Sequence, residues 1–182
     1  LIFELWQAIK EDIEKKKIFR ASEILSPFIF NYNRYINIYS GASISQEVFE
    51  HARDKGSAVH LGCKYLLEGR KLKEDSIDEN IRPYLDQFQN CKDFQDFMAT
   101  HKIISLEKQY ISEKYHYTGT PDIVVEGAII DIKTIEASMF TLEQVVAYAT
   151  LVADADMKLY ELILQPDSAK FRELGTKEGE KE

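Results

Sequence analysis

Cysteine, long apolar runs and positive charge are all in short supply in this sequence. The two cysteines, Cys63 and Cys91, lie far apart and lack the paired spacing of a zinc or iron–sulfur site. We therefore expect two small buried hydrophobic side chains and a reducing, intracellular (cytoplasmic) compartment. No apolar run approaches the roughly 20 residues of a transmembrane helix, so we expect no membrane partner. The 182 residues are enough to bury a core of ordinary size.

Positive charge is outnumbered, because 31 acidic residues face 23 basic ones and the net charge is −8. Nucleic-acid binders are usually basic, so the total argues against such a partner. The distribution weakens this argument, since residues 51–73 contain six Lys/Arg and two acids. The local field steers a polyanion more than the total charge does, which leaves nucleic acid open as a partner. The basic residues that we expect to contact phosphate are Arg53, Lys55, Lys64 and Arg70.

Hydrophobic spacing divides the chain into three parts. We expect a helical N-terminal region at 1–42, a core domain at 43–174, and a charged, disordered tail at 175–182. Within the core, the pattern predicts helices over 43–54 and 57–68 with Gly56 interrupting them, and a third helical block over 77–99. The apolar stripe of that block is typical of core packing: Ile81, Tyr84, Leu85, Phe88, Cys91, Phe94 and Phe97.

The period then changes to that of strands. Residues 102–113 alternate like one strand, and "DIVVE" and "AIIDIKT" read as two strands joined by a turn at Glu126-Gly127. Residues 139–154 return to helical spacing, and "KLYELILQP" reads as a further strand. Helices followed by β-β-β-α-β predict an α/β fold in which helices flank a central mixed sheet.

Acids occupy unexpected places in this strand pair. Residues two apart in a strand point the same way, so Asp131 and Lys133 share one face. If the strands form a hairpin, Asp122 lies about level with Asp131 at the open end. Two carboxylates beside an ammonium suit a hard cation such as Mg²⁺. The ordinary alternative is a surface salt bridge between Asp131 and Lys133, with Asp122 in a turn.

Four short sequence motifs along residues 56–164 occur in the same order as in one known protein superfamily. Pro121-Asp122, followed after eight residues by Asp131-Ile132-Lys133, resembles the signature of the PD-(D/E)XK nuclease superfamily. The chain is similar in particular to the RecB-type, lambda-exonuclease-like branch of that superfamily. The other matching patterns are a G-x-x-x-H at Gly56–His60, a preceding glutamate at Glu107, and a Q-x-x-x-Y at Gln144–Tyr148.

The resemblance implies a role for each matching residue. The metal ligands for Mg²⁺ or Mn²⁺ would be Asp122, Asp131 and the backbone carbonyl of Ile132. Glu107 would add a ligand or orient a metal-bound water, and His60 would lie near the metal, where it can bind a second ion. Lys133 would position or deprotonate the attacking water, or offset charge on the phosphate. Gln144 and Tyr148, which share a helix face, would contact a phosphate or hold Lys133 in place. Two cysteines cannot supply the cysteine quartet of the iron–sulfur members, so no iron–sulfur cluster is expected.

The function implied is metal-dependent hydrolysis of DNA by a restriction-endonuclease-like α/β core. The branch suggests an exonuclease at single-stranded or duplex DNA ends in recombination, repair or replication, with a protein of those pathways as a further partner. It leaves a viral source, and hence the host cytoplasm, open, along with polarity and oligomeric state. The alternatives are a non-catalytic DNA-binding or assembly module of the same fold and a structure-specific endonuclease. No P-loop pattern occurs that would indicate a helicase.

Overall fold

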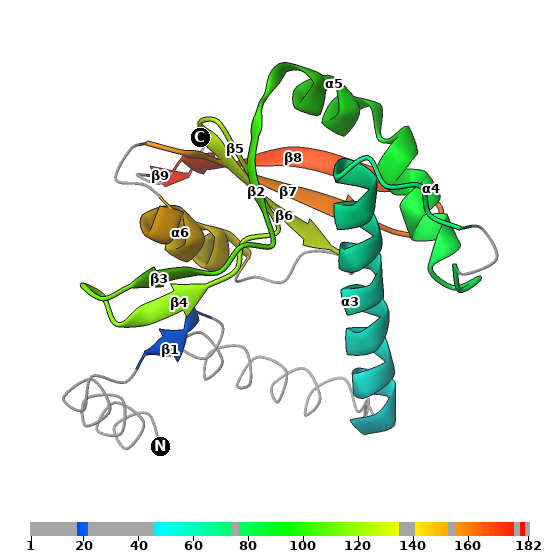
Figure 1. Cartoon of the computed structure of the whole chain (residues 1–182), viewed down its shortest axis with the longest axis horizontal. Coiled ribbons are helices and arrows are strands. Elements are labelled where there is room, and N and C mark those ends of the chain that lie inside the picture. Colours follow the sequence, from blue (N-terminus) through cyan, green and yellow to red (C-terminus); the bar gives the residue numbers. More distant parts are fainter. Residues whose placement is uncertain are drawn as a thin grey trace.

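Helices and strands mix along the chain (Figure 1). The structure is a computed structural model that describes residues 18–21, 46–73, 77–134, 141–152, 156–176 and 179–180. The helices among these residues are α3 (Gln46–Leu67), α4 (Arg82–Asn90), α5 (Lys92–Thr100) and α6 (Thr141–Val152). The strands are β1 (Phe19–Arg20), β2 (Ile103–Leu106), β3 (Tyr110–Ser112), β4 (Tyr117–Gly119), β5 (Ile123–Val125), β6 (Ala128–Lys133), β7 (Lys158–Leu164), β8 (Ala169–Thr176) and β9 (Gly179–Glu180).

The described strands form two sheets. The central sheet has six strands in the order β2-β5-β6-β7-β8-β9. β6 and β7 are parallel, whereas the other neighbouring pairs are antiparallel, so the sheet is mixed as predicted. The parallel pair is joined through α6, as a parallel crossover requires. A smaller sheet in the order β1-β4-β3 packs against α6 (Figure 1).

Both faces of the central sheet are covered, which explains why β5 to β7 are almost continuously apolar. α3, α4 and α5 cover one face and α6 covers the other (Figure 1). Ile130 and Ile132 of β6 belong to the core of the first face, and Ile129 to that of the second. The aromatic stripe predicted as core packs into the first face. Cys63 and Cys91 are buried and unbridged, as expected.

Two helix boundaries differ from the prediction. α3 runs unbroken through Gly56, because a single glycine costs a helix only roughly 1 kcal/mol. A Cβ at Gly56 would lie 3.4 Å from Oγ1 of Thr134. The block predicted over 77–99 divides at Cys91, whose ψ of 92° is extended, into α4 and α5. Pro83 occupies the first turn of α4, where its missing N–H costs no helical hydrogen bond.

The strand predicted over 102–113 is two strands that belong to different sheets. Glu107 lies between them with a φ of 44°, in the left-handed region that side chains other than glycine rarely adopt. The chain therefore turns at Glu107, from β2 in the central sheet to β3 in the smaller one. A period-2 pattern cannot reveal such a turn, because it continues across it.

The two ends of the chain are only partly described. The predicted helical region 1–42 lies outside the described residues except for 18–21, where β1 pairs in parallel with β4, so Phe19 is in a strand and not a helix. The tail predicted to be disordered, 175–182, contains strand residues instead. Residues 175 and 176 complete β8, and Gly179–Glu180 pairs with it as β9. Backbone pairing to the edge of β8 stabilises this charged segment. None of the described helices is long and apolar enough to cross a bilayer.

Candidate metal centre

The β5–β6 hairpin brings the two predicted acids level with each other. Ile123 pairs with Ile130, so the next step of the ladder places Asp122 opposite Asp131. The turn has Gly127 at a φ of 76°, a conformation that costs glycine no steric penalty. This confirms the predicted hairpin and puts Asp122 at the point where β5 begins while β6 continues toward its carboxyl end.

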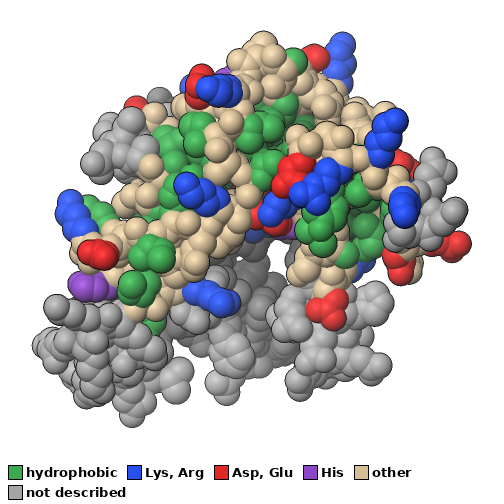
Figure 2. Space-filling view, in the orientation of Figure 1, with side chains coloured by type: hydrophobic (Ala, Val, Ile, Leu, Met, Phe, Trp, Pro, Cys, Tyr) green, Lys and Arg blue, Asp and Glu red, His purple; other side chains and the backbone are tan. Residues whose placement is uncertain are grey.

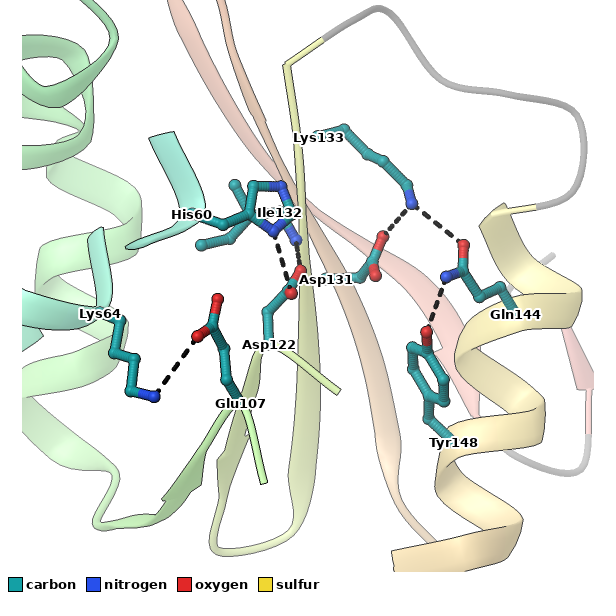
Figure 3. Close-up of polar contacts among 9 residues, drawn as sticks. All are labelled: His60, Lys64, Glu107, Asp122, Asp131, Ile132, Lys133, Gln144 and Tyr148. Carbon is teal, nitrogen blue, oxygen red and sulfur yellow. Dashed lines mark hydrogen bonds and ion pairs between the residues drawn. The ribbon is translucent and has the colours of Figure 1, made fainter. Parts of the chain in front are cut away.

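Asp122 is held by three separate segments, two of which contact its carboxylate in Figure 3. Its Oδ1 lies 3.1 Å from Nδ1 of His60 on α3. Its Oδ2 accepts a hydrogen bond of 2.7 Å from the backbone N–H of Ile132 on β6. Its own carbonyl accepts one of 2.9 Å from the N–H of Glu107, just after β2. The carboxylate is therefore fixed before any ligand binds.

Three of the predicted ligands form a compact donor set. His60, Glu107 and Asp122 each offer one ligand atom, and these atoms lie within 4.8 Å of one another. Ile132, whose carbonyl is a further predicted ligand, lies beside this set, since its N–H donates to Asp122. One imidazole and several oxygens fit a divalent cation such as Mg²⁺ or Mn²⁺. The surface is hollowed between α3 and the β3–β4 hairpin, and charged and histidine side chains gather there (Figure 2).

One side of α3 supplies the helical part of the centre. Gly56, His60 and Lys64 are four residues apart and lie on the same side of the helix. They contact, in order, the end of β6, the start of β5 and the end of β2. Val59 and Cys63, both 0% exposed, anchor the adjacent side in the core. Successive turns of α3 therefore lie beside different strands of the central sheet.

Asp131 lies on the other side of the β6 backbone from this donor set (Figure 3). Its Oδ2 forms an ion pair of 2.7 Å with Nζ of Lys133, and the side chain faces α6. Among the described residues, the compact ligand group does not include Asp131. Asp131 and Lys133 share a strand face, as predicted, and form an ion pair there.

Two consecutive hydrogen bonds connect Lys133 to side chains of α6. Its Nζ donates a hydrogen bond of 3.0 Å to Oε1 of Gln144, whose amide donates one of 2.8 Å to the hydroxyl of Tyr148. Burial raises the pKa of Tyr148 to about 12, although the Gln144 bond opposes this, so the phenol stays protonated. The predicted pair Gln144 and Tyr148 therefore contacts the predicted lysine.

Burial and neighbouring charges alter the protonation of this centre. Burial, followed by the charge of Asp122, raises the pKa of Asp131 to about 6, although Lys133 opposes the shift. Burial alone would lower the pKa of His60, but its hydrogen bond to Asp122 and the charges of Asp122 and Asp131 outweigh burial and raise it. Without a cation, the centre holds protons more tightly than the same groups do in an unfolded chain.

This protonation gives stability a pH dependence that can be measured in EDTA. The pKa of Asp131 rises from 3.8 unfolded to about 6 folded, so the folded state binds the extra proton between those values. Stability from this source is present below pH 4 and is lost as the pH rises to 6. We expect the melting temperature of wild type to fall between pH 4 and 6 relative to that of Asp131→Asn. Parallel melting curves for the two proteins over this range would contradict the expectation.

The backbone of β4 packs directly on the ring of Tyr148. A Cβ at Gly119 would lie 2.7 Å from Cδ1 and from Cε1 of Tyr148, and 2.9 Å from Cδ1 of Leu151. Glycine is required here by this close approach, because any side chain would displace the ring. Displacing the ring would in turn move Gln144 and its bond to Lys133.

We expect Gly119→Ala to lower the free energy of unfolding by about 1–3 kcal/mol, as overpacking of a tight site does. Chemical denaturation gives this value directly. Gly56→Ala is the matched control, because its Cβ would meet only Thr134 Oγ1 at 3.4 Å and alanine favours the helix by up to about 1 kcal/mol. If Gly119→Ala unfolds at the same denaturant concentration as wild type, the proposed contact with Tyr148 is not tight.

The four predicted phosphate contacts do not form one basic track. Lys55 is nine residues from Lys64, which places them on opposite sides of α3, and its Nζ donates a 3.0 Å hydrogen bond to the hydroxyl of Tyr84 on α4. Arg70 follows the end of α3 and pairs with an acid two residues earlier. Arg53 lies in α3, but its side chain is outside the described atoms. Of the three whose side chains are described, Lys64 is the one that contacts the candidate centre.

An acidic residue that the sequence analysis missed is adjacent to the centre. Glu161 of β7 is the register partner of Asp131 and is 0% exposed. Its Oε1 pairs with Nε of Arg172 on β8, while its Oε2 is buried without a hydrogen-bond partner among the described residues. A lone acid inside the apolar run "KLYELIL" was the available signal, because a strand buried on both faces rarely includes a charge without a partner.

Comparison with known proteins adds no assignment. No known protein-family model matches this chain, and no curated protein gives a significant match. The function is therefore inferred from the geometry of the centre.

Proposed function

We propose that this chain is a Mg²⁺- or Mn²⁺-dependent deoxyribonuclease with a restriction-endonuclease-like core. The observation that carries the proposal is the arrangement of two groups about β6 (Figure 3). His60, Glu107 and Asp122 form a cation-ligand set on one side, and Lys133 is held by Asp131 on the other. Phosphodiester hydrolysis uses this combination of a cation and a nearby ammonium. The resemblance to the lambda-exonuclease-like PD-(D/E)XK branch supports the same assignment.

Different residues would have different roles in the proposed reaction. When bound, the cation would polarise the phosphate and lower the pKa of a water. His60, Glu107 and Asp122 would hold it, together with the carbonyl of Ile132. Lys133 has three N–H donors, of which Asp131 and Gln144 engage two. The third can therefore face the attacking water or the charge that develops on the phosphate.

The proposed substrate is DNA, cut from single-stranded or duplex ends to leave 5′-phosphate products. The choice of ends, and of recombination, repair or replication as the setting, follows the resemblance. Lys64 supplies positive charge beside the centre of a chain whose net charge is −8. A local cation can attract a phosphate that the total charge would repel.

Incubation with linear duplex, closed circular and single-stranded DNA tests the proposal. We expect linear DNA to be degraded in Mg²⁺ or Mn²⁺ and to survive in EDTA. Lys133→Met should slow cleavage by about 10²–10³-fold, the usual cost of losing one donor to developing charge. Lys92→Met is the matched control, because it removes the same charge from an exposed position at the start of α5.

The other outcomes separate the alternatives. Closed circles cut as fast as linear ends would replace the exonuclease with an endonuclease. DNA binding without cleavage in either metal would favour a non-catalytic module of the same fold. Equal rates for wild type and Lys133→Met would show that Lys133 has no catalytic role.

A further inference from the structure

Lys64 shares a ligand with the cation that the centre would bind. Its Nζ lies 3.4 Å from Oε2 of Glu107, and Glu107 is one of the three residues whose ligand atoms lie within 4.8 Å of one another. A cation bound to that carboxylate would lie about 2 Å from its oxygen. The ammonium and the cation therefore compete for the same carboxylate group.

The environment of Lys64 allows it to leave. Its side chain is 27% exposed and that of Glu107 is 26% exposed, so water reaches both groups. A partly exposed pair that water reaches contributes little to stability. The backbone of Glu107, by contrast, is fixed by its N–H bond to the carbonyl of Asp122. Glu107 would stay in place without Lys64, while Lys64 can turn into solvent.

We propose that Lys64 is a cation-released DNA contact, which neutralises Glu107 while the centre lacks a cation and turns to a DNA phosphate once a cation binds. The proposal rests on the proposed function, since it takes the cation and the DNA from it. Two positive charges at one carboxylate repel each other strongly at a few ångströms. Cation binding therefore ejects the ammonium, and DNA binding at Lys64 in turn leaves Glu107 open to the cation.

A static brace is the competing role, and it predicts the opposite sign. If Lys64 only held Glu107 in position, its removal would leave the carboxylate less ordered and weaken cation binding. If Lys64 competes with the cation, its removal strengthens cation binding. The sign of one measurement on the protein alone therefore separates the two roles.

The first experiment titrates Mn²⁺ into the full chain by calorimetry, without DNA. We expect Lys64→Met to bind Mn²⁺ about 3- to 10-fold more tightly than wild type, as removal of a nearby like charge predicts. Lys64→Arg, which keeps the charge, should match wild type, and so should Lys92→Met, which removes a distant one. Unchanged or weaker binding by Lys64→Met overturns the proposal.

The second experiment measures binding to a phosphorothioate linear duplex, which resists hydrolysis, in EDTA and in Mn²⁺. Mn²⁺ should strengthen DNA binding more for wild type than for Lys64→Met. A loss of affinity that is equal in both conditions overturns the proposal, because Lys64 would then contact DNA without release. Failure of the proposed function is a distinct result: wild type would bind no Mn²⁺, or would bind it and leave natural DNA intact.

Discussion

Asp122→Asn should leave the fold intact and remove both Mn²⁺ binding and DNA cleavage. The amide can still accept the N–H bond of Ile132, so the hairpin keeps its local support. It cannot supply the negative charge that His60 and a cation require. Loss of a group that merely supports a metal ligand costs about 10–100-fold in affinity, so loss of a ligand should cost at least that much.

Calorimetric titration with Mn²⁺ and a cleavage assay on the same preparation give the two readouts. A melting curve in EDTA shows whether the variant is folded. Asp86→Asn provides the matched control, because it removes the same charge from an exposed position on α4. Wild-type Mn²⁺ affinity in Asp122→Asn would move the cation site away from this residue.

Arg172→Met should lower the free energy of unfolding by about 3 kcal/mol, because it leaves a buried carboxylate without its counter-ion. Glu161 is 0% exposed, and its register neighbour on β6 is another acid, Asp131. The value lies at the low end for a buried pair, since the side chain of Arg172 is 54% exposed. For a chain of this size the melting temperature should fall by roughly 6–12 °C.

The double variant Glu161→Leu/Arg172→Met should recover most of this loss. Replacing a buried ion pair by apolar side chains is often neutral or stabilising, whereas removing one partner is costly. Urea denaturation of the wild type, both single variants and the double variant completes the cycle, with Lys102→Met as an exposed control. If the double variant is no more stable than Arg172→Met, the cost does not come from the carboxylate of Glu161.

Short-range patterns predicted the parts of the centre that depend on local structure. The alternation of "AIIDIKT" placed Asp131 and Lys133 on one strand face, and a turn at Gly127 was enough to bring Asp122 level with Asp131. The four-residue spacing of Gln144 and Tyr148 put both on the side of α6 that faces Lys133. These relations follow from the period of a single element or from one tight turn.

Relations between distant elements could not be predicted in this way. The pairing of Glu161 with Arg172 depends on which strands adjoin β7, and β8 was not anticipated at all. Within α3, the divergence of Lys55 from Lys64 was missed for another reason, because the prediction broke the helix at Gly56 between them. The sequence could not predict that Asp131 lies apart from the cation ligands, because Asp122 and Asp131 both precede Lys133 in the same motif.

The contact between Gly119 and Tyr148 has a consequence for inhibition. The smaller sheet packs on the ring of Tyr148, and the amide of Gln144 links Tyr148 to Lys133. None of these residues is among the cation ligands. A small molecule that wedged the ring of Tyr148 away from β4 would thus withdraw the support of Lys133 while leaving the cation in place. On the proposed function, such a compound would slow DNA cleavage without competing with DNA, and extra substrate would not reverse it.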